Sequence, residues 1–532
     1  MGVRGLSTAA EIFADEGKLG FLMTLSSAAM RLRNTDTDRA DHVNTVEVVK
    51  GGVNTPTVAY QSDAWAVAAA HLTMLDADDM PSLRPVASGD KNFPATGLES
   101  GIFTSMNGAA LVARSDDALF IAFRGSNDVD GGIGWSPDSS QWGPKRTEHY
   151  KLFAELNAAV AAYAEVHPEI TKVYVTGHSL GGGMVNAFMQ SHPGDLYEAV
   201  SFGSIRYGNG TSRADSRVTN VWNDGDVALL LGGRADGDNI RFKLAGPDVV
   251  SQHMPWLYQA EIKFVSDLGY GIDDLSGYNR VVLGAVSTGL FSSGIGIGAD
   301  SLAGTSGRDL ILGGAGSDRM QGWGGRDRID GGSGSRDAAV YTEKAAGIAV
   351  DLNGSNFVDV VVGGRTEDRI RRIEDIAGGS GDDTIVGDSH PNRLAGNGGA
   401  DRIVGGRGND RLWGGAGQDT LTGGSNKDAF VFNVRPGQAN ADHVTDFTPG
   451  VDHIELDDAI YEAIGGRVQA REFYSAWRSG GIAHDRDDRL IYDERNGALF
   501  YDADGSKQSY DPHLIAILEG KPVLHHADIL IA

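Results

Sequence analysis

The feature that most constrains the fold of this sequence is an acidic residue that recurs every nine residues in its second half. Two blocks carry the period, Asp300, Asp309, Asp318, Asp327 and then Asp383, Asn392, Asp401, Asp410, Asp419, Asp428. In the best units, such as 405–413 (GGRGNDRLW), glycine takes positions one, two and four and the acid takes position six. The residue two places after the acid is apolar, as in Ile311, Met320, Ile329, Ile385, Leu394, Ile403, Leu412, Leu421 and Phe430. A fixed period of this kind is typical of a repeat architecture.

The spacing predicts a glycine-rich turn followed by a three-residue strand whose middle side chain points inward. Each acid would supply carboxylate oxygens and each turn backbone carbonyl oxygens. Calcium takes about six to eight oxygen ligands, so two neighbouring turns can complete one site. We therefore predict bound Ca²⁺, with ligands from Asp309, Asp318, Asp327, Asp383, Asp401, Asp410, Asp419 and Asp428. The unit 387–395 (GDSHPNRLA) has Asn392 at the acid position and lacks most of the glycines, which predicts weak binding or none.

This pattern resembles the RTX nonapeptide repeat, and the resemblance implies the parallel β-roll of that family. We expect the roll over residues 298–432, in two blocks at 298–341 and 378–432. Residues 342–375 should interrupt it without leaving the sheet, with strands at 347–352 and 357–362. A C-terminal β segment at 433–532 follows, which resembles the ends of RTX proteins. The final Asp528-Ile-Leu-Ile-Ala resembles the uncleaved signal of type I secretion.

The first half, residues 1–290, reads as a mixed α/β domain with one chemical motif. Residues 177–181 (GHSLG) fit G-x-S-x-G, between a strand-like run at 173–176 and a helix-compatible run at 182–190. The motif requires this strand–turn–helix context, in which the sharp turn exposes the serine oxygen. The helix N-terminus behind it offers N–H groups to an oxyanion. The motif predicts a serine hydrolase with Ser179 as nucleophile.

In this arrangement the acid and then the histidine follow the serine along the chain. Residues 218–228 read as a strand ending in an acidic loop, which contains both Asp224 and Asp226. Between Ser179 and the repeats the sequence has two histidines, His192 and His253. His192 comes thirteen residues after Ser179, so we expect it at the far end of the helix. His253 is therefore the predicted base, whereas His178 is expected to pack beside the turn.

Together with residues 121–127 (IAFRGSN), these segments resemble the class 3 lipases, and most closely the RTX lipases exported by type I systems. The resemblance implies an α/β-hydrolase catalytic domain at 1–290, followed by the all-β parallel roll. It implies a triacylglycerol lipase or carboxylesterase that cleaves lipid acyl esters through an acyl-enzyme on Ser179. It also implies Asp226 as the acid, His253 as the base, and Ser126 and Leu180 as the oxyanion hole. The proline that often follows the acid is absent, so the choice between Asp226 and Asp224 stays open.

The expected partners are a lipid or ester substrate, the lipid–water interface and a type I secretion apparatus, and the expected location is outside the cell. Alternatives are a phospholipase A1-type enzyme, which shares every motif, or a non-catalytic RTX surface protein with a decayed hydrolase domain. Residues 127–143 hold Trp135 and Trp142 among glycines, and we hypothesise that they contact the lipid surface as a lid. The alternative is that both tryptophans pack in the core.

Composition and termini exclude several other classes. The chain has 72 acidic and 46 basic residues, a net charge of −26, which argues against a nucleic-acid partner. It has no cysteine, which excludes disulfides, thiol catalysis and cysteine-based zinc sites. Glu11, Asp15 and Glu16 precede the apolar stretch 19–30, whereas a cleavable signal begins with basic residues. We expect that stretch to form a surface or lid helix, and neither uncharged run, 173–194 or 281–299, to cross a membrane.

Overall fold

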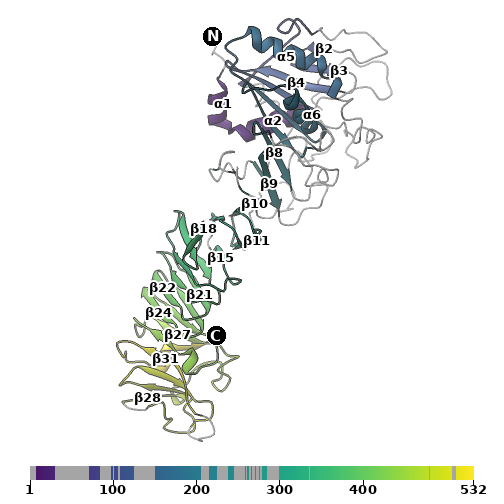
Figure 1. The fold of residues 1–532 in the computed structure, drawn as a ribbon. Helices are drawn as coiled ribbons and strands as arrows, with labels where there is room; N and C mark the ends of the chain where they lie inside the picture. Colours follow the sequence, from purple (N-terminus) through teal and green to yellow (C-terminus); the bar gives the residue numbers. More distant parts are fainter. Residues whose placement is uncertain are drawn as a thin grey trace, which may run out of the picture. The chain divides into compact units, whose positions relative to one another are not determined.

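The protein was examined as a computed structural model, in which the chain forms two compact units (Figure 1). One contains residues 1–281 and 286–295, and the other residues 282–285 and 296–532. The structure describes residues 7–29, 71–83, 97–99, 101–105, 108–124, 150–204, 215–223, 238–244, single positions between 258 and 278, and then 280–283, 299–334, 336–477, 480–505 and 511–532. Within these ranges, no helix has the length and hydropathy needed to cross a membrane.

The first unit is built on a mixed sheet in the order β2-β3-β4-β5-β6-β7-β8-β9. Strands β2 (Gly97–Glu99), β3 (Ile102–Ser105), β4 (Gly108–Arg114) and β5 (Ala118–Phe123) are antiparallel neighbours, and β1 (Thr73–Met74) also pairs with β4. From β5 onward the neighbours are parallel, through β6 (Lys172–His178), β7 (Tyr197–Phe202), β8 (Val218–Asn223) and β9 (Asp238–Leu244). A short strand, β10 (Arg280–Leu283), contains the residues at which the chain passes from the first unit to the second.

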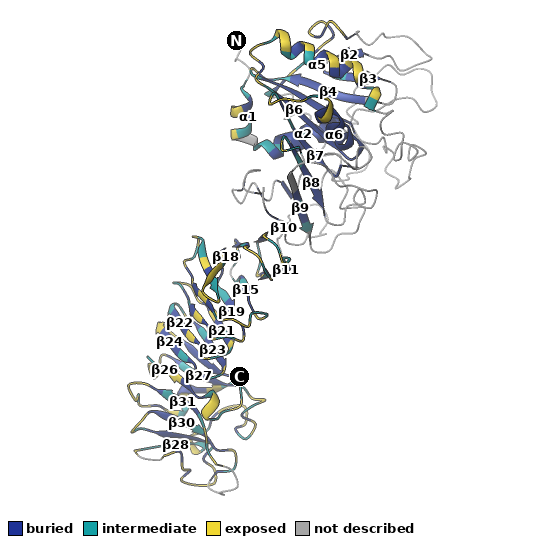
Figure 2. Cartoon of the chain, in the orientation of Figure 1, coloured by how far each residue is buried: buried dark blue, intermediate teal, exposed yellow. Residues whose placement is uncertain are grey.

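Parallel neighbours need crossover connections, and within the described residues two helices supply the first two of them. Helix α5 (Ala154–Val166) connects β5 to β6, and α6 (Leu180–Ser191) connects β6 to β7. All six residues of β5 (ALFIAF) are buried, as expected of a strand covered on both faces. Figure 2 shows the central strands of this unit as buried.

The N-terminal helices correct one expectation. Helix α1 (Ala9–Glu16) begins with a capping box between Thr8 and Glu11. Helix α2 (Lys18–Ala29) is not a surface or lid helix, because most of its residues are buried; they are Leu19, Phe21, Leu22, Met23, Leu25, Ser26, Ser27, Ala28 and Ala29. The Thr176 Oγ1 of β6 donates to the Leu22 carbonyl at 3.2 Å. A helix that is apolar on all sides is expected to be buried. For α2 this composition is a better guide to its location than its position near the N-terminus.

The second unit is a roll of two β-sheets. The first sheet is wholly parallel and comprises β11 (Ser301–Ala303), β13 (Arg319–Gln321), β15 (Ala338–Val340), β19 (Asp375–Ala377), β21 (Arg393–Gly398), β23 (Arg411–Ala416), β25 (Ala429–Phe432), β27 (His453–Leu456) and β32 (Ile529–Ile531). The repeat strands of the second sheet are β12 (Asp309–Gly314), β14 (Arg328–Gly332), β20 (Thr384–Val386), β22 (Arg402–Arg407) and β24 (Thr420–Ser425). Successive strands alternate between the sheets, and residues pair with partners eighteen positions along, such as Leu394 with Leu412. One turn of the roll therefore contains two repeats.

The predicted inward side chains form the core of the roll. All nine apolar residues in phase with the repeat are 0% exposed; they are Ile311, Met320, Ile329, Ile385, Leu394, Ile403, Leu412, Leu421 and Phe430. Strands β13 and β20 have three residues each, with a buried residue in the middle. The prediction of a three-residue strand with one inward side chain is confirmed for these units.

The interruption between the blocks stays in the second sheet, as predicted. Strand β16 (Ile348–Asp351) pairs in parallel with β20, and β17 (Val358–Val362) is antiparallel to β16. A third strand, β18 (Arg365–Arg371), is antiparallel to β17 and parallel to β14. The sequence of β18, RTEDRIR, did not predict a strand because it is mostly charged. Such a sequence is tolerated because only Asp368 and Ile370 of this strand are buried.

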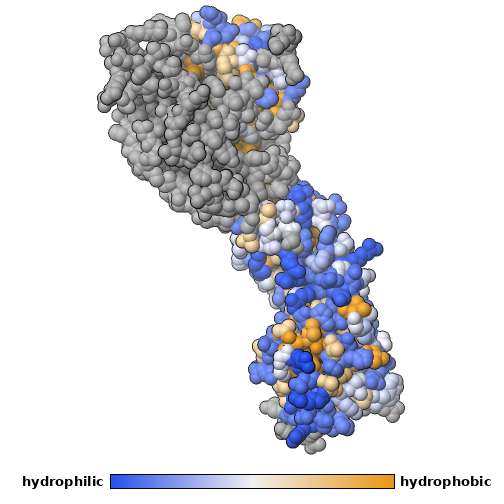
Figure 3. Space-filling view, turned by 180° about the vertical axis from the view of Figure 1, so that it is seen from behind, coloured by the Kyte–Doolittle hydropathy of each residue, from blue (hydrophilic) through white to orange (hydrophobic). Residues whose placement is uncertain are grey.

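Residues 433–532, which we expected as a separate segment, continue both sheets. Strand β26 (Asp442–Val444) pairs in parallel with β24 and β31 (His513–Leu518), while β27 and β32 extend the first sheet. The second sheet ends with β30 (Ala498–Tyr501), β29 (Leu490–Asp493) and β28 (Phe473–Ala476). Short 3-10 turns lie at Gln438–Asn440, Ala470–Glu472 and His526–Asp528. The surface of this unit is mostly hydrophilic with local apolar patches (Figure 3).

Candidate active site and metal-binding roll

Ser179 lies at the junction between β6 and α6, in a backbone conformation that few side chains adopt. It is the N-cap residue of α6, with φ 57° and ψ −120°, and it is 3% exposed. Its N–H donates to the Phe202 carbonyl of β7 at 2.9 Å, and its carbonyl accepts from the Gly183 N–H at 3.2 Å. A strained serine between a strand and a helix is the geometry that the G-x-S-x-G motif requires.

The glycines around Ser179 allow this turn to close. A Cβ on Gly177 would lie 2.5 Å from the carbonyl carbon of Gly181, and a Cβ on Gly182 would lie 2.8 Å from the Ser204 Cβ. A Cβ on Gly181 would overlap the Phe123 carbonyl and lie 3.0 Å from the Arg124 carbonyl oxygen. The elbow therefore packs against the carboxyl end of β5, two residues before Ser126.

The first turn of α6 can hold negative charge. Leu180 is the first helical residue and is buried. The first N–H groups of a helix have no intrahelical acceptor, and the helix dipole favours an anion there. The N–H of Leu180 is thus in the position expected of an oxyanion donor.

A buried polar contact holds the elbow helix against the following loop. Asn186 Nδ2 donates to the Gly182 carbonyl at 3.0 Å and to the Ser204 Oγ at 3.1 Å. On the neighbouring strands, Ser201 Oγ donates to Asn220 Oδ1 at 2.6 Å. The Asn186–Ser204 bond links α6 to the residues after β7, and the Ser201–Asn220 bond links β7 to β8.

Tyr258 links three segments that carry predicted site residues. Its hydroxyl accepts from the Asn223 N–H at 3.1 Å, at the last residue of β8 and one position before Asp224. Its ring meets His178 edge to face, with centroids 5.7 Å apart, and the His178 side chain adjoins Ser179 in the chain. Tyr258 is 0% exposed and follows His253 by five residues. Sequence reasoning missed Tyr258, since a lone tyrosine gives no motif.

Several predicted residues lie outside the described part of the chain, namely Ser126, Asp224, Asp226, His253 and both lid tryptophans, Trp135 and Trp142. His192 lies at the end of α6, where its ring stacks on Phe188 with centroids 3.9 Å apart. Its Nδ1 lies 2.9 Å from the Phe188 carbonyl oxygen. This position at the far end of the helix is the one we expected.

In the roll, the predicted metal ligands form ladders of buried carboxylates. The N–H of each acid donates to Oδ1 of the acid in the next turn, as from Asp401 to Asp419 at 2.8 Å and from Asp410 to Asp428 at 2.9 Å. The eight predicted ligands are buried, with exposures of 0–2%. Six of them have an Oδ2 atom without a hydrogen-bond partner among the described residues; they are Asp318, Asp327, Asp401, Asp410, Asp419 and Asp428.

The unit 405–413 shows why the turn needs its glycines. Gly406 and Gly408 have φ angles of 104° and 128°, which disfavour other residues. A Cβ on Gly405 would lie 2.5 Å from the Asp410 Oδ2 and 2.5 Å from the Gly423 carbonyl oxygen. The space in front of Gly405 is thus lined by a carboxylate oxygen and a carbonyl oxygen, which are the donors that calcium prefers.

Buried carboxylates at this density oppose ionisation. Burial, together with neighbouring acids, raises the pKa of Asp401 and Asp410 from 3.8 to about 7. Burial and the charges of Asp368 and Asp309 raise the pKa of Asp327 to about 8. A bound cation would favour the ionised form and supply a partner for the free oxygens. The residues present therefore fit Ca²⁺.

The Asn392 turn is different. Asn392 Nδ2 donates to the Glu374 carbonyl at 2.8 Å, and its Oδ1 accepts from the Asp388 N–H at 2.9 Å. Both side-chain atoms are thus satisfied by the protein. Weak binding or none at this turn stays a prediction.

The ladders also contain acids that the nine-residue period did not reveal. The N–H groups of Asp318 and Asp327 donate to Asp337 and Asp368, which lie 19 and 41 residues further along. In the second block, Asp419 and Asp428 donate to acids 23 and 24 residues along, Asp442 and Asp452. The triplet Asp368-Arg369-Ile370 repeats Asp327-Arg328-Ile329, which is a sequence signal that could have identified it.

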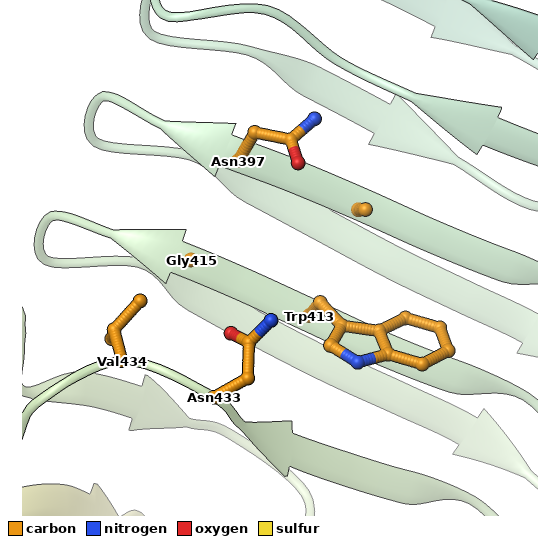
Figure 4. Close-up of a pocket in the computed structure, with 6 residues that line it drawn as sticks. Asn397, Trp413, Gly415, Asn433 and Val434 are labelled. Carbon is orange, nitrogen blue, oxygen red and sulfur yellow. The ribbon is translucent and has the colours of Figure 1, made fainter. Parts of the chain in front are cut away.

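Two further features of this unit lie apart from the ladders. A pocket of about 320 Å³ is lined by Ala395, Asn397, Trp413, Gly415, Asn433 and Val434 (Figure 4). The Arg411 guanidinium lies 5.0 Å from the centroid of the Trp413 ring. A cluster elsewhere brings ligating atoms within 4.8 Å of one another, from His484, Asp485 and Asp488.

Comparison with protein families identifies the repeats. The RTX calcium-binding nonapeptide repeat matches four stretches, at residues 296–329, 303–336, 372–397 and 395–429. The second unit carries RTX calcium-binding repeats. They bind calcium, and the matches span both blocks of the buried ladders.

Comparison with other proteins gave structural similarities only. No curated protein matches this sequence significantly. The extracellular lipase LipA of Serratia marcescens is 17% identical, with 98% of each chain covered and a TM-score of 0.43. The AlgE6R3 subunit of the Azotobacter vinelandii mannuronan C5-epimerase is 25% identical over 28% of this chain and 78% of that chain, with a TM-score of 0.20. A Rhizomucor miehei lipase propeptide complex is 18% identical over 44% of this chain and 70% of that chain, with a TM-score of 0.22.

Proposed function

We propose that this protein is a secreted, calcium-dependent serine carboxylester hydrolase with an α/β-hydrolase catalytic domain, a lipase that cleaves acyl esters of lipids. The observation that carries the proposal is the backbone of Ser179, held at φ 57° between β6 and α6. Such strain at a strand–helix junction is retained where a nucleophile must be presented. The surrounding parallel strands with helical crossovers support the same domain type.

In the proposed mechanism, Ser179 Oγ attacks the ester carbonyl carbon while His253 accepts its proton and Asp226 orients the imidazole. The N–H groups of Leu180 and Ser126 stabilise the oxyanion. Collapse of the intermediate breaks the ester bond, and His253 protonates the leaving alcohol. Water, deprotonated by His253, then hydrolyses the acyl-enzyme and regenerates Ser179.

The packing described above supports these roles. Gly181 packs against Arg124, so the chain that continues to Ser126 leaves β5 beside the helix N-terminus. Tyr258 connects the end of β8, which precedes Asp226, to the elbow. Ser126 and Asp226 would thus reach the site from the ends of β5 and β8, at the same edge of the sheet.

Calcium and export are linked in this proposal. Without calcium, the ionised aspartates of adjacent turns repel one another and the roll should remain loosely folded. Because free calcium is low inside bacterial cells and higher outside, the chain would fold after passing a type I secretion apparatus. The RTX repeats support this part of the proposal.

The test is a panel of triglyceride, phospholipid and short p-nitrophenyl esters, assayed for the wild type and Ser179→Ala with calcium and with chelator. We expect hydrolysis in calcium, strong loss in chelator, and a fall of about 10⁴-fold or more in kcat for Ser179→Ala. Preference for phospholipid would favour a phospholipase A1-type enzyme. Failure to hydrolyse any ester, in folded calcium-loaded protein, would favour a non-catalytic RTX surface protein.

The acid is tested separately by two neighbouring variants. We expect Asp226→Asn to lower kcat far more than Asp224→Asn, because only the orienting carboxylate fixes the tautomer of the base. A severe loss confined to Asp224→Asn would assign the role to Asp224.

A further inference from the structure

In a regular turn of the roll, two oxygen atoms converge in front of the first glycine. For Gly405 they are the Asp410 Oδ2 and the carbonyl oxygen of Gly423, eighteen residues later, each 2.5 Å from an ideal Cβ position. Gly313 shows the same pair, with Asp318 Oδ2 and the Gly331 carbonyl oxygen both at 2.5 Å. Calcium prefers oxygen donors of these two kinds, so we expect the repeats to hold the ion near such a pair.

The turn at Gly322 departs from this pattern. The Asp327 Oδ2 lies in front of Gly322 as in other units, but the second oxygen is Asp368 Oδ2, at 3.4 Å from the ideal Cβ position. Asp368 belongs to β18, in the segment that interrupts the repeats. A carboxylate oxygen from the interruption thus lies in front of Gly322, where the turns at Gly313 and Gly405 have a glycine carbonyl oxygen.

Asp368 is in the ladder register of a repeat aspartate. The Asp327 N–H donates to Asp368 Oδ1 at 2.9 Å, and the Arg369 N–H donates to the Asp327 carbonyl at 2.9 Å. The regular pair Asp410 and Asp428 makes the same two bonds, at 2.9 Å and 2.8 Å. Strands β14 and β18 are parallel, with Arg328 opposite Arg369.

The charge around this pair requires compensation. Asp327 and Asp368 are each 2% exposed, and the Asp327 Oδ2 has no hydrogen-bond partner among the described residues. Asp309 and Glu367 add further negative charge, and Lys344 brings one ammonium group. Lys344 Nζ already pairs with two other acids, Glu367 at 2.5 Å and Glu343 at 3.4 Å. This one ammonium group therefore cannot balance the charges of all the acids around it.

We propose that Asp327 and Asp368 form a calcium site that is completed by the interrupting segment and not by a nonapeptide turn. The interrupting segment would then supply a calcium ligand to the last turn of the first block, in addition to continuing the sheet. The inference rests on calcium binding by the repeats and is independent of the proposed hydrolase activity.

The test counts calcium in the full-length, calcium-loaded protein after equilibrium dialysis, by atomic emission. Asp368→Asn should lose one calcium per chain relative to the wild type. The control is Asp359→Asn, which changes an exposed acid on the adjacent strand β17 that pairs with Arg369 at 3.2 Å. It should keep the wild-type count. An unchanged count in Asp368→Asn, with retained β-sheet circular dichroism, would overturn the proposal.

A second variant covers the case in which Asp368→Asn fails to fold. Lys344→Met removes the neighbouring ammonium and should tighten calcium binding at this site several-fold, because a like charge is removed. The affinity is read from calcium titration of the folded protein. An unchanged or weakened affinity would mean that no calcium binds near Lys344, and would overturn the proposal. Neither measurement depends on ester hydrolysis, so the outcome is separate from that of the proposed function.

Discussion

Removal of calcium should make the stability of the roll strongly dependent on pH. Burial raises the pKa of Asp401 and Asp410 from 3.8 to about 7, and that of Asp327 to about 8. Because these values lie above the ordinary value, the folded state without metal binds protons more tightly than the unfolded chain. Its stability should therefore be greatest near pH 4 or below and should be lost as the pH rises toward about 8.

The size of the effect follows from these values. For one aspartate, a pKa that is about three units higher in the folded state than in the unfolded chain corresponds to about 4 kcal/mol, at about 1.4 kcal/mol per unit. Two such residues already reach about 8 kcal/mol, which is comparable with the whole stability of a typical domain, about 5–15 kcal/mol. The ladders contain more than two, so at neutral pH the roll without calcium should be largely unfolded. Calcium binds the ionised form, so its stabilising effect should grow with pH.

The assay is thermal unfolding followed by circular dichroism, at about pH 5.5 and about pH 8, in chelator and in excess calcium. In chelator, the melting temperature of the β signal should fall between the two pH values, whereas in calcium it should rise or stay constant. A β signal in chelator that melts at the same temperature at both pH values would refute the reasoning.

Three further changes probe single contacts. Gly405→Ala places a Cβ against Asp410 and should destabilise the calcium-loaded roll by about 1–3 kcal/mol in thermal melts. The control is Gly465→Ala, which should have no effect because nothing lies within 4 Å of the added Cβ. Asn392→Asp replaces a satisfied amide with a carboxylate, and should lower the melting temperature in chelator more than in calcium; equal changes would contradict this. Tyr258→Phe removes the hydroxyl that accepts a hydrogen bond from the Asn223 N–H. It should lower kcat on a soluble ester several-fold with little change in KM. A change confined to KM would argue against a positioning role for Tyr258.

The repeat could be predicted in detail from the sequence because its period fixes the structure locally. Glycine at position one and an acid at position six determine the turn, and the apolar residue two places later must then point inward, as Leu412 does. The elbow at Ser179 is similarly local, since the small residues that it needs adjoin it in the chain. In both cases the residues that give the sequence signal lie within a few positions of one another.

What the sequence did not reveal depends on long-range register. Asp368 joins the ladder 41 residues after Asp327 because β16, β17 and β18 are inserted into the sheet, and no short period can encode that length. Tyr258 acts through contacts with β8 and the elbow, far away in the chain. Helix α2 is a different case, because its apolar composition itself indicates burial, and the expectation of a surface or lid helix was wrong for that reason.

The most direct test of the central claim is fluorophosphonate labelling of the calcium-loaded protein, followed by intact mass measurement and peptide mapping. We predict one adduct per chain, on Ser179, and none in Ser179→Ala. Absence of an adduct in folded wild-type protein, or an adduct on another serine, would contradict the assignment of Ser179 as the nucleophile.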